Sequence, residues 1–316
     1  MTSFILAALF SALSPAARAA DPAYPFPLPL GMAAPDVPED NALTKAKVEL
    51  GKLLYFDKRL SRDGTVSCAT CHDPKKGWTD QAPVSTGIKG QKGGRSAPTV
   101  LNSAYLDVQF WDGRAASLEE QAKGPIANPV EMGFTHEEAV KRLAGIKGYP
   151  PLFKAAFGDD AVSIDRVAKA IASFERIVVT GNAPYDRQEA KKGEMAPAAR
   201  RGMALYFGKA NCSVCHSGPN FTDSQFHNLG VGMAAAKPDL GRYDQTKLEA
   251  DKGAFKTPTL RNLRDTAPYM HDGSQGTLVE VVAFYNKGGE KNASLSDKMR
   301  PLKLSDAEQK DLVAFL

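Results

Sequence analysis

The four cysteines of this 316-residue chain all stand in two C-x-x-C-H motifs. Two thiols at this spacing can bond covalently to the two vinyl groups of one haem, and the histidine that follows then faces the iron as an axial ligand. The pattern therefore predicts two covalently bound haem c groups, attached through both cysteines of each motif. The residues concerned are Cys68, Cys71 and His72 in the first motif, and Cys212, Cys215 and His216 in the second.

Two other uses of paired cysteines explain less of this pattern. A zinc site can take two C-x-x-C pairs, and proteins in an oxidising compartment form disulfides. Zinc does not require a histidine directly after each pair, and such a short loop makes a poor disulfide. Both alternatives leave His72 and His216 unexplained.

An internal repeat surrounds the two motifs. GKLLYFDK begins at Gly51 and GMALYFGK begins at Gly202, and each segment leads into its C-x-x-C-H motif. We therefore expect two domains of one design, each formed around a haem. Beyond the motifs, pairs of residues recur at an offset of 160 positions: Asp112-Gly113 with Asp272-Gly273, Leu118 with Leu278, Glu120 with Glu280, and Trp111 with His271.

The repeat has one mismatch with chemical meaning. At the same offset, Tyr285 in the second half aligns with Pro125 in the first. A tyrosine oxygen can ligate haem iron, whereas proline has no ligating side chain. If this position faces the iron from the side opposite the histidine, the second haem is closed and the first is open to a peroxide.

The elements that position these residues are expected to be helices. We predict an all-α fold of two tandem cytochrome c-like haem domains, with long loops and few strands. A helix precedes each haem motif, and in the first of these Val48, Leu53 and Phe56 are spaced for one face. Further helices are expected at about 135–145, 163–178 and 305–316, with capping boxes at Thr135 and Glu138 and at Ser305 and Glu308, while 228–256 has no assigned structure.

The N-terminal segment resembles an export signal. It has a short apolar run, Phe4 to Leu13, and a small-residue cleavage site at 17–19, although no Lys or Arg precedes the run. The run is shorter than the roughly 18 apolar residues that span a bilayer. We therefore expect an exported, periplasmic protein that does not span the membrane, with an uncleaved anchor as the alternative. The predicted domains are a signal peptide at 1–20, a proline-rich tether or surface wrap at 21–41, and haem domains at 42–188 and 189–316.

The overall charge gives no sign of a nucleic-acid partner. The chain has 40 basic and 36 acidic residues, for a formal net charge of +4. Nucleic-acid-binding domains carry a much stronger basic excess, clustered on one face. We therefore expect no nucleic-acid partner.

From about Leu43 onward the chain carries seven short motifs in a fixed order. Together they resemble the bacterial di-haem cytochrome c peroxidase and MauG superfamily, and the resemblance covers nearly the whole predicted mature chain. The motifs are Cys68-x-x-Cys71-His72, Ala97-Pro98-Thr99 to Asn102, Phe110-Trp111-Asp112-Gly113-Arg114, Gln121-x-x-Gly124-Pro125, Val130-Glu131-Met132, Cys212-x-x-Cys215-His216 and Pro268-Tyr269-Met270-His271-Asp272-Gly273.

The resemblance implies different roles for the two haems. The N-terminal haem, held by His72, would be the high-spin peroxidatic site. The C-terminal haem, held by His216, would be the low-spin site that transfers electrons. Typical peroxidases of the superfamily have a methionine as the second ligand of the C-terminal haem. Here that position matches Tyr285, as in MauG-like members, with a core tyrosine beside Phe284 as the alternative.

Three residues match positions with catalytic roles in the superfamily. Trp111 would relay electrons between the haems, and Gln121 and Glu131 would line the pocket in which peroxide binds. Glu131 would take the proton from hydrogen peroxide and return it to the leaving oxygen, as a general acid–base catalyst. The alternatives are a tryptophan that packs in the core, a glutamine on a polar helix face and an ordinary surface carboxylate.

Two further positions depart from the typical members. The histidine that blocks their peroxidatic haem until it is activated by reduction is replaced by Ile88, so we expect the diferric protein to react with peroxide directly. The resemblance also implies a calcium ion between the domains, bound partly by the backbone carbonyls of Thr266 and Pro268. The asparagine that helps to bind this ion in typical members is Ser96 here.

The leading functional hypothesis is a periplasmic dihaem oxidoreductase that reacts with hydrogen peroxide at the N-terminal haem. Its oxidising equivalents, shared with the C-terminal haem, would oxidise a partner protein, and Tyr285 and Ile88 favour this MauG-like activity. The alternative is a cytochrome c peroxidase that reduces hydrogen peroxide to water with electrons from small cytochromes or cupredoxins. A remote alternative is a non-enzymatic dihaem electron carrier, although Pro125 and Ile88 leave its first haem without a candidate sixth ligand.

Overall fold

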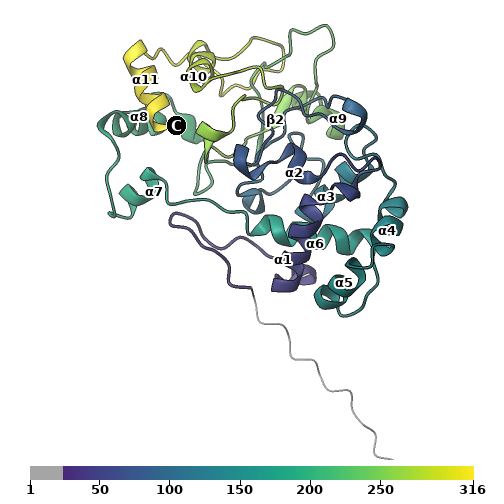
Figure 1. Ribbon diagram of the computed structural model, residues 1–316. Helices are drawn as coiled ribbons and strands as arrows, with labels where there is room; N and C mark the ends of the chain where they lie inside the picture. Colours follow the sequence, from purple (N-terminus) through teal and green to yellow (C-terminus); the bar gives the residue numbers. More distant parts are fainter. Residues whose placement is uncertain (1–23) are drawn as a thin grey trace, which may run out of the picture.

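Helices form most of the regular structure (Figure 1). This computed structural model describes residues 24–316, so the predicted signal peptide at 1–20 lies outside the described residues. Within residues 24–316 the strands form one antiparallel pair, β1 (Phe226–Asn228) with β2 (Ala254–Lys256). The predicted all-α class with few strands is therefore confirmed. No helix in the described part of the chain is both long and apolar enough to cross a membrane.

In the N-terminal half, two helices cross a central helix, α6 (Ile164–Arg176). Both α1 (Lys45–Phe56) and α3 (Leu118–Ala127) pack against this helix. Gly51 allows α1 and α6 to approach closely, because a Cβ atom there would lie 1.8 Å from the carbonyl oxygen of Ala170. Such a crossing leaves no space for any side chain at position 51.

The predicted buried face of the first helix is wrong at two of its three positions. Val48 is buried, but Leu53 is 51% exposed and Phe56 is 42% exposed. The close crossing at Gly51 decides which face is buried, so residues on the glycine side, including Leu54 and Tyr55, face the core instead. Simple helical spacing could not reveal this, because both faces of α1 carry apolar residues.

The other predicted helices are confirmed. The capping boxes at Thr135 and Ser305 begin α4 and α11 as expected, and each N-cap hydroxyl accepts a hydrogen bond from the N–H of the glutamate three residues on. These two helices are α4 (His136–Ala144) and α11 (Asp306–Phe315). The N-terminal half also contains the short helices α2 (Cys68–Cys71), α5 (Tyr149–Phe157) and α7 (Pro184–Glu189).

The C-terminal half repeats the helical frame of the N-terminal half. α8 (Pro197–Phe207) crosses α11 as α1 crosses α6, and a Cβ atom at Gly202 would lie 2.0 Å from the carbonyl oxygen of Asp311. α10 (Leu278–Lys287) repeats α3, because the N-cap residues Ser117 and Thr277 accept equivalent hydrogen bonds. In Figure 1 the first frame is purple to teal and the second is green to yellow.

The segment 228–256, which had no predicted structure, connects the two halves. It contains α9 (Tyr243–Thr246) and ends in β2. Asp239 forms an ion pair with Arg95 at 2.6 Å, and the Lys256 N–H donates to the carbonyl oxygen of Trp111 at 2.8 Å. A segment of the second half is thus fixed to the residues around Trp111 in the first.

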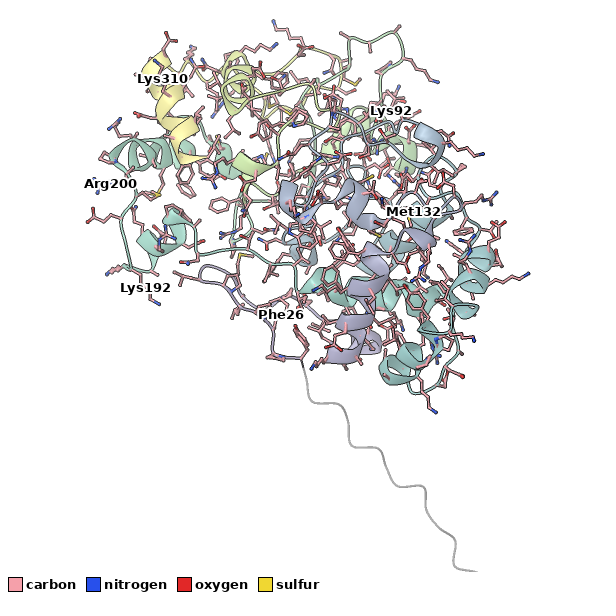
Figure 2. The ribbon with its side chains drawn as sticks, viewed as in Figure 1. Phe26, Lys92, Met132, Lys192, Arg200 and Lys310 are labelled. Carbon is pink, nitrogen blue, oxygen red and sulfur yellow. The ribbon has the colours of Figure 1, made fainter. Side chains whose placement is uncertain are left out.

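The described part of the proline-rich segment, 24–41, lies along the folded body. The Tyr24 N–H donates to the carbonyl oxygen of Leu43, and the Tyr105 hydroxyl donates to the carbonyl oxygen of Ala33 at 2.8 Å. Phe26 packs against the core of the N-terminal half (Figure 2). These contacts make this part a surface wrap.

Candidate functional site

The first C-x-x-C-H motif opens onto a cavity of about 560 Å³ in the N-terminal half. Cys68, Cys71 and His72 line one part of it. Gln121 and Pro125, from α3, line another, together with Glu131 from the loop that follows. The predicted attachment residues and the predicted pocket residues therefore meet in one space.

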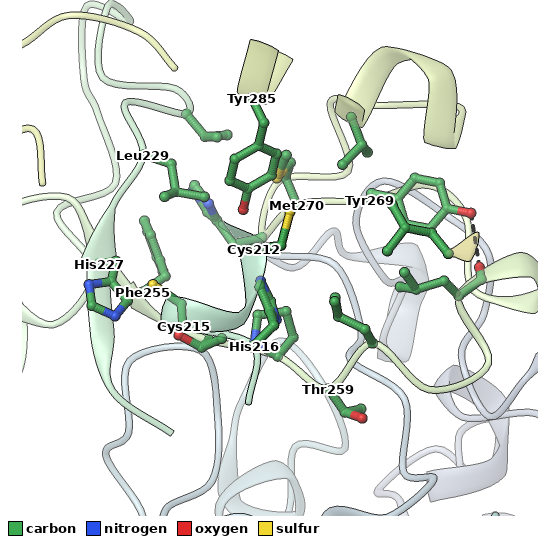
Figure 3. Close-up of a pocket in the computed structure, with 18 of the residues that line it drawn as sticks. Cys212, Cys215, His216, His227, Leu229, Phe255, Thr259, Tyr269, Met270 and Tyr285 are labelled. Carbon is green, nitrogen blue, oxygen red and sulfur yellow. Dashed lines mark hydrogen bonds between the residues drawn. The ribbon is translucent and has the colours of Figure 1, made fainter. Parts of the chain in front are cut away.

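The second C-x-x-C-H motif opens onto a cavity of about 230 Å³ in the C-terminal half. Cys212, Cys215, His216 and Tyr285 all line it. In Figure 3 the side chain of Tyr285 descends from α10 with its hydroxyl directed into the space near Cys212 and His216. Met270 lines the same cavity, so a sulfur atom is also present there.

Both cavities fit a covalently bound haem. All four cysteines carry free thiols rather than disulfides. The imidazole Nδ1 of His72 lies 3.3 Å from the carbonyl oxygen of Trp78, and that of His216 lies 3.1 Å from the carbonyl oxygen of Phe221. When Nδ1 is held by a carbonyl in this way, Nε2 is left as the free nitrogen for a metal.

Burial of the two histidines favours the form that binds metals. It lowers the pKa of His72, and it lowers the pKa of His216 to about 4. Both imidazoles are therefore neutral near pH 7, and the neutral ring is the form with a lone pair available for iron.

Pro125 and Tyr285 occupy equivalent places in equivalent helices, as the repeat predicts. They lie on α3 and α10, whose N-caps match, and each lines its own cavity. Burial raises the pKa of Tyr285, so the free phenol keeps its proton. A bound cation reverses this preference, because it supplies the positive charge that a buried phenolate lacks.

Glu131 lies in the first cavity as a largely buried carboxylate. Asn128 donates to its Oε1 at 3.0 Å, and burial raises its pKa. Ile88, by contrast, packs its side chain into the core of the N-terminal half, close to Gly133, while its N–H donates to the Glu131 carbonyl oxygen. The Ile88 loop therefore supports the residue beside the cavity and presents no ligating side chain.

Trp111 lines both cavities, as does the segment 96–99. Its indole N–H donates to the carbonyl oxygen of Ser96 at 2.9 Å, which fixes the ring in this shared wall. The ring centroid of His271 lies 6.5 Å from that of Trp111, and Phe255 stacks on His271 at 3.6 Å. An aromatic cluster thus stands between the two haem sites.

Thr266, Pro268 and Ser96 all line the second cavity. Backbone carbonyl and hydroxyl oxygens suit Ca²⁺, which usually takes six to eight oxygen ligands. Within residues 24–316, however, the one group of three or more acidic, histidine or cysteine ligands is Cys215, Asp223 and His227, which includes none of these three residues. The fit to calcium is therefore incomplete.

Several cavity residues were not predicted from the sequence. His227 lies 3.3 Å from Asp223 and lines the second cavity together with Cys215. Glu175 lines the first cavity from α6. A helical wheel of 163–178 would have placed Glu175 on the buried face, which is the signal that could have found it.

Two family models match the chain in succession. A di-haem cytochrome c peroxidase model matches residues 45–194, and a cytochrome c model matches residues 199–316. Together these matches cover both C-x-x-C-H motifs.

Named proteins and a solved structure are similar to this chain over most of its length. It is 47% identical to the methylamine utilization protein MauG of Methylorubrum extorquens, covering 88% of this chain and 79% of that protein. It is 46% identical to the cytochrome c551 peroxidase of Nitrosomonas europaea, covering 74% and 71%. A crystal structure of a MauG-like protein associated with microbial copper homeostasis superposes with a TM-score of 0.85 at 34% identity, covering 93% of this chain and 94% of that one.

Proposed function

Because this chain belongs to the di-haem cytochrome c peroxidase and MauG family, it is a haem peroxidase-type oxidoreductase, and we propose that it uses hydrogen peroxide to oxidise a partner protein in the periplasm. The observation that carries this proposal is the Tyr285 hydroxyl directed into the second haem cavity. Tyrosine at that position distinguishes MauG-like members from the typical methionine-ligated peroxidases in the resemblance described above.

The chain's own residues would hold the two haems as follows. Cys68 and Cys71 would attach the first haem and His72 would ligate its iron, while Pro125, in the place of Tyr285, would offer no ligand. Cys212 and Cys215 would attach the second haem, and His216 and Tyr285 would ligate its iron. When bound, the haems supply iron that exchanges single electrons and, in the first cavity, a coordination position open to peroxide.

Polar residues of the first cavity would transfer the protons of hydrogen peroxide during its reduction. Conversion of hydrogen peroxide to two water molecules takes up two electrons and two protons. Glu131 would accept the proton of the near peroxide oxygen and return it to the leaving oxygen. The Asn128 amide, which donates to Glu131 at 3.0 Å, holds the carboxylate in place. Gln121, on the same cavity, would orient the peroxide by a hydrogen bond.

Trp111 would carry electrons between the two haem sites. It lines both cavities, and its indole is fixed by Ser96. The second haem would thereby share in the oxidation. The partner protein could then be oxidised at a distance from the peroxide.

A specific observation favours a second candidate, the cytochrome c peroxidase. Met270 and Met299 both line the second cavity, so a sulfur ligand is within the same space as Tyr285. A methionine-ligated haem has a higher reduction potential and is suited to relaying electrons from small cytochromes or cupredoxins.

One experiment separates the two candidates. The dihaem protein is mixed with hydrogen peroxide and either a periplasmic extract of its own cells or a reduced small cytochrome c or cupredoxin. We expect new covalent oxidation products on one extract protein, detected by mass spectrometry, and slow oxidation of the small donors. Fast turnover with a small donor and an unmodified extract would assign the protein to the peroxidases.

A further inference from the structure

A carboxyl group that the proposed mechanism does not use faces the first haem cavity. Glu175 lies near the end of α6, is 6% exposed and lines that cavity. The neighbouring Arg176 does not neutralise it, because this guanidinium forms a bidentate ion pair with Glu119 at 2.7 and 2.9 Å. Among the side-chain hydrogen bonds of residues 24–316, none involves the Glu175 carboxyl group.

The second cavity has no such group at the matching position. Gly51 packs on Ala170 and Phe174, and Gly202 packs on Asp311 and Phe315 in the same way. This superposition of the two helix crossings aligns Glu175 with Leu316, and both residues line their cavities. The carboxyl group is therefore a feature of the first cavity and is not required by the shared frame.

The surroundings of Glu175 favour its neutral form. Burial raises its pKa to about 8, and the Arg176 charge opposes this only in part. The other titratable groups that face it bring no positive charge: Tyr55 from α1, Cys68 from α2 and Glu119 from α3. The two arginines that line the same cavity, Arg95 and Arg114, are both paired with Asp112. A buried acid without a counter-charge ionises more readily when positive charge is added nearby, and less readily when it is removed.

We propose that Glu175 is the proton-coupling residue of the first haem, which releases its proton when that haem loses an electron and takes it up again when the electron returns. In the reductive direction one electron arrives from the donor and one proton moves from water to the Glu175 carboxylate. In the oxidative direction both leave. The cavity charge therefore stays nearly constant while the haem changes its oxidation state. This proposal rests on a haem at 68–72 and not on the identity of the partner.

The test is a redox titration of the dihaem protein at a series of pH values, with the two haems followed by their separate absorption bands. In the wild type we expect the reduction equilibrium of the first haem to shift by up to about tenfold per pH unit, towards the oxidised form as the pH rises. Glu175→Gln, which keeps the shape but cannot ionise, should remove most of this dependence. Reduced-minus-oxidised infrared spectra should show a protonated carboxyl band in the wild type that is absent from the variant.

Two further variants keep the outcome interpretable. Glu131→Gln, in the same cavity, should retain the pH dependence of the first haem, and Leu316→Glu should introduce one at the second. An unchanged pH dependence in Glu175→Gln, or its loss in Glu131→Gln alone, would overturn the proposal. A protein whose mass shows no haem at 68–72 would instead overturn the proposed function.

Discussion

The two haem cavities share one frame and differ in what lines it. α3 and α6 line the first, with α1 packed on α6, and α8, α10 and α11 line the second, with matching glycines and N-caps. The differences lie at three matched positions. Gln121, Pro125 and Glu175 in the first correspond to Val281, Tyr285 and Leu316 in the second. Under the proposed function, haem attachment would depend on the shared frame, whereas the chemistry at each haem would depend on a few side chains within it.

The largest effect is expected when the two cysteines of one motif are removed: the haem of that half alone should be lost. The mass of the acid-denatured wild-type protein should show two covalent haem additions. Cys68→Ala with Cys71→Ala should remove one, and Cys212→Ala with Cys215→Ala should remove the other. A wild-type mass that corresponds to a single haem, or to none, would refute the assignment.

The next largest effect is expected at Glu131 in the first cavity, because no carboxyl side chain among residues 24–316 lines the second. Glu131→Gln should keep both haems but slow the reaction with peroxide by about 10²-fold or more, because an amide cannot move the proton. Burial raises the pKa of Glu131, and the carboxylate is the active form, so the wild-type rate should fall as the pH drops through this raised pKa.

Stopped-flow mixing with hydrogen peroxide across a pH series measures both effects. Glu137→Gln, an exposed glutamate in the first turn of α4, is the matched control and should react like the wild type. Unchanged kinetics in Glu131→Gln would remove Glu131 from the mechanism.

A smaller effect should follow from making the second cavity resemble that of a typical peroxidase. A phenolate oxygen stabilises ferric iron more than a methionine sulfur does, so Tyr285→Met should raise the reduction potential of the second haem. The same substitution should slow the oxidation of a protein partner more than it slows peroxide turnover with a reduced small donor.

Redox titration of the second haem tests the role of Tyr285. Tyr269→Phe is the control, because Tyr269 lines the same cavity but its hydroxyl donates to the Leu263 carbonyl oxygen at 2.9 Å. If Tyr285→Met and the wild type have equal potentials, another side chain, such as Met270, is the ligand.

The smallest effect concerns activation of the first cavity. Because Ile88 cannot ligate iron and packs in the core, reducing the protein beforehand should change the rate of its reaction with peroxide little. Rates measured on diferric and half-reduced samples decide this. A diferric protein that fails to react would mean that another residue closes the first haem.

Local patterns in the sequence predicted the parts of the fold that repeat. Both haem motifs and the capped helices follow from short spacings. The equivalence of Pro125 and Tyr285 follows from the repeat offset of 160 positions, and the structure places these two residues on matching helices. The buried face of α1 could not be predicted in this way, since it depends on how closely Gly51 approaches α6.

Contacts between residues that are far apart in the sequence could not be predicted either. The buried ion pair between Asp186 and Arg261 joins α7 to the second half, with donor–acceptor distances of 2.8 and 2.9 Å. No sequence motif relates these two residues. Glu175 was overlooked because an acidic residue in an amphipathic helix is usually exposed. Its place on the helical wheel of 163–178 indicates the buried face, and the packing of α6 shows that it is enclosed.

The wall formed by Trp111 and the segment 96–99 has a consequence for how the protein matures. This wall borders both cavities, so neither cavity is complete until the two halves have docked. A haem that fills one side supports the same residues that the other haem must contact. Each bound haem would therefore stabilise the docked form of the two halves, and the loss of one haem would weaken the site of the other.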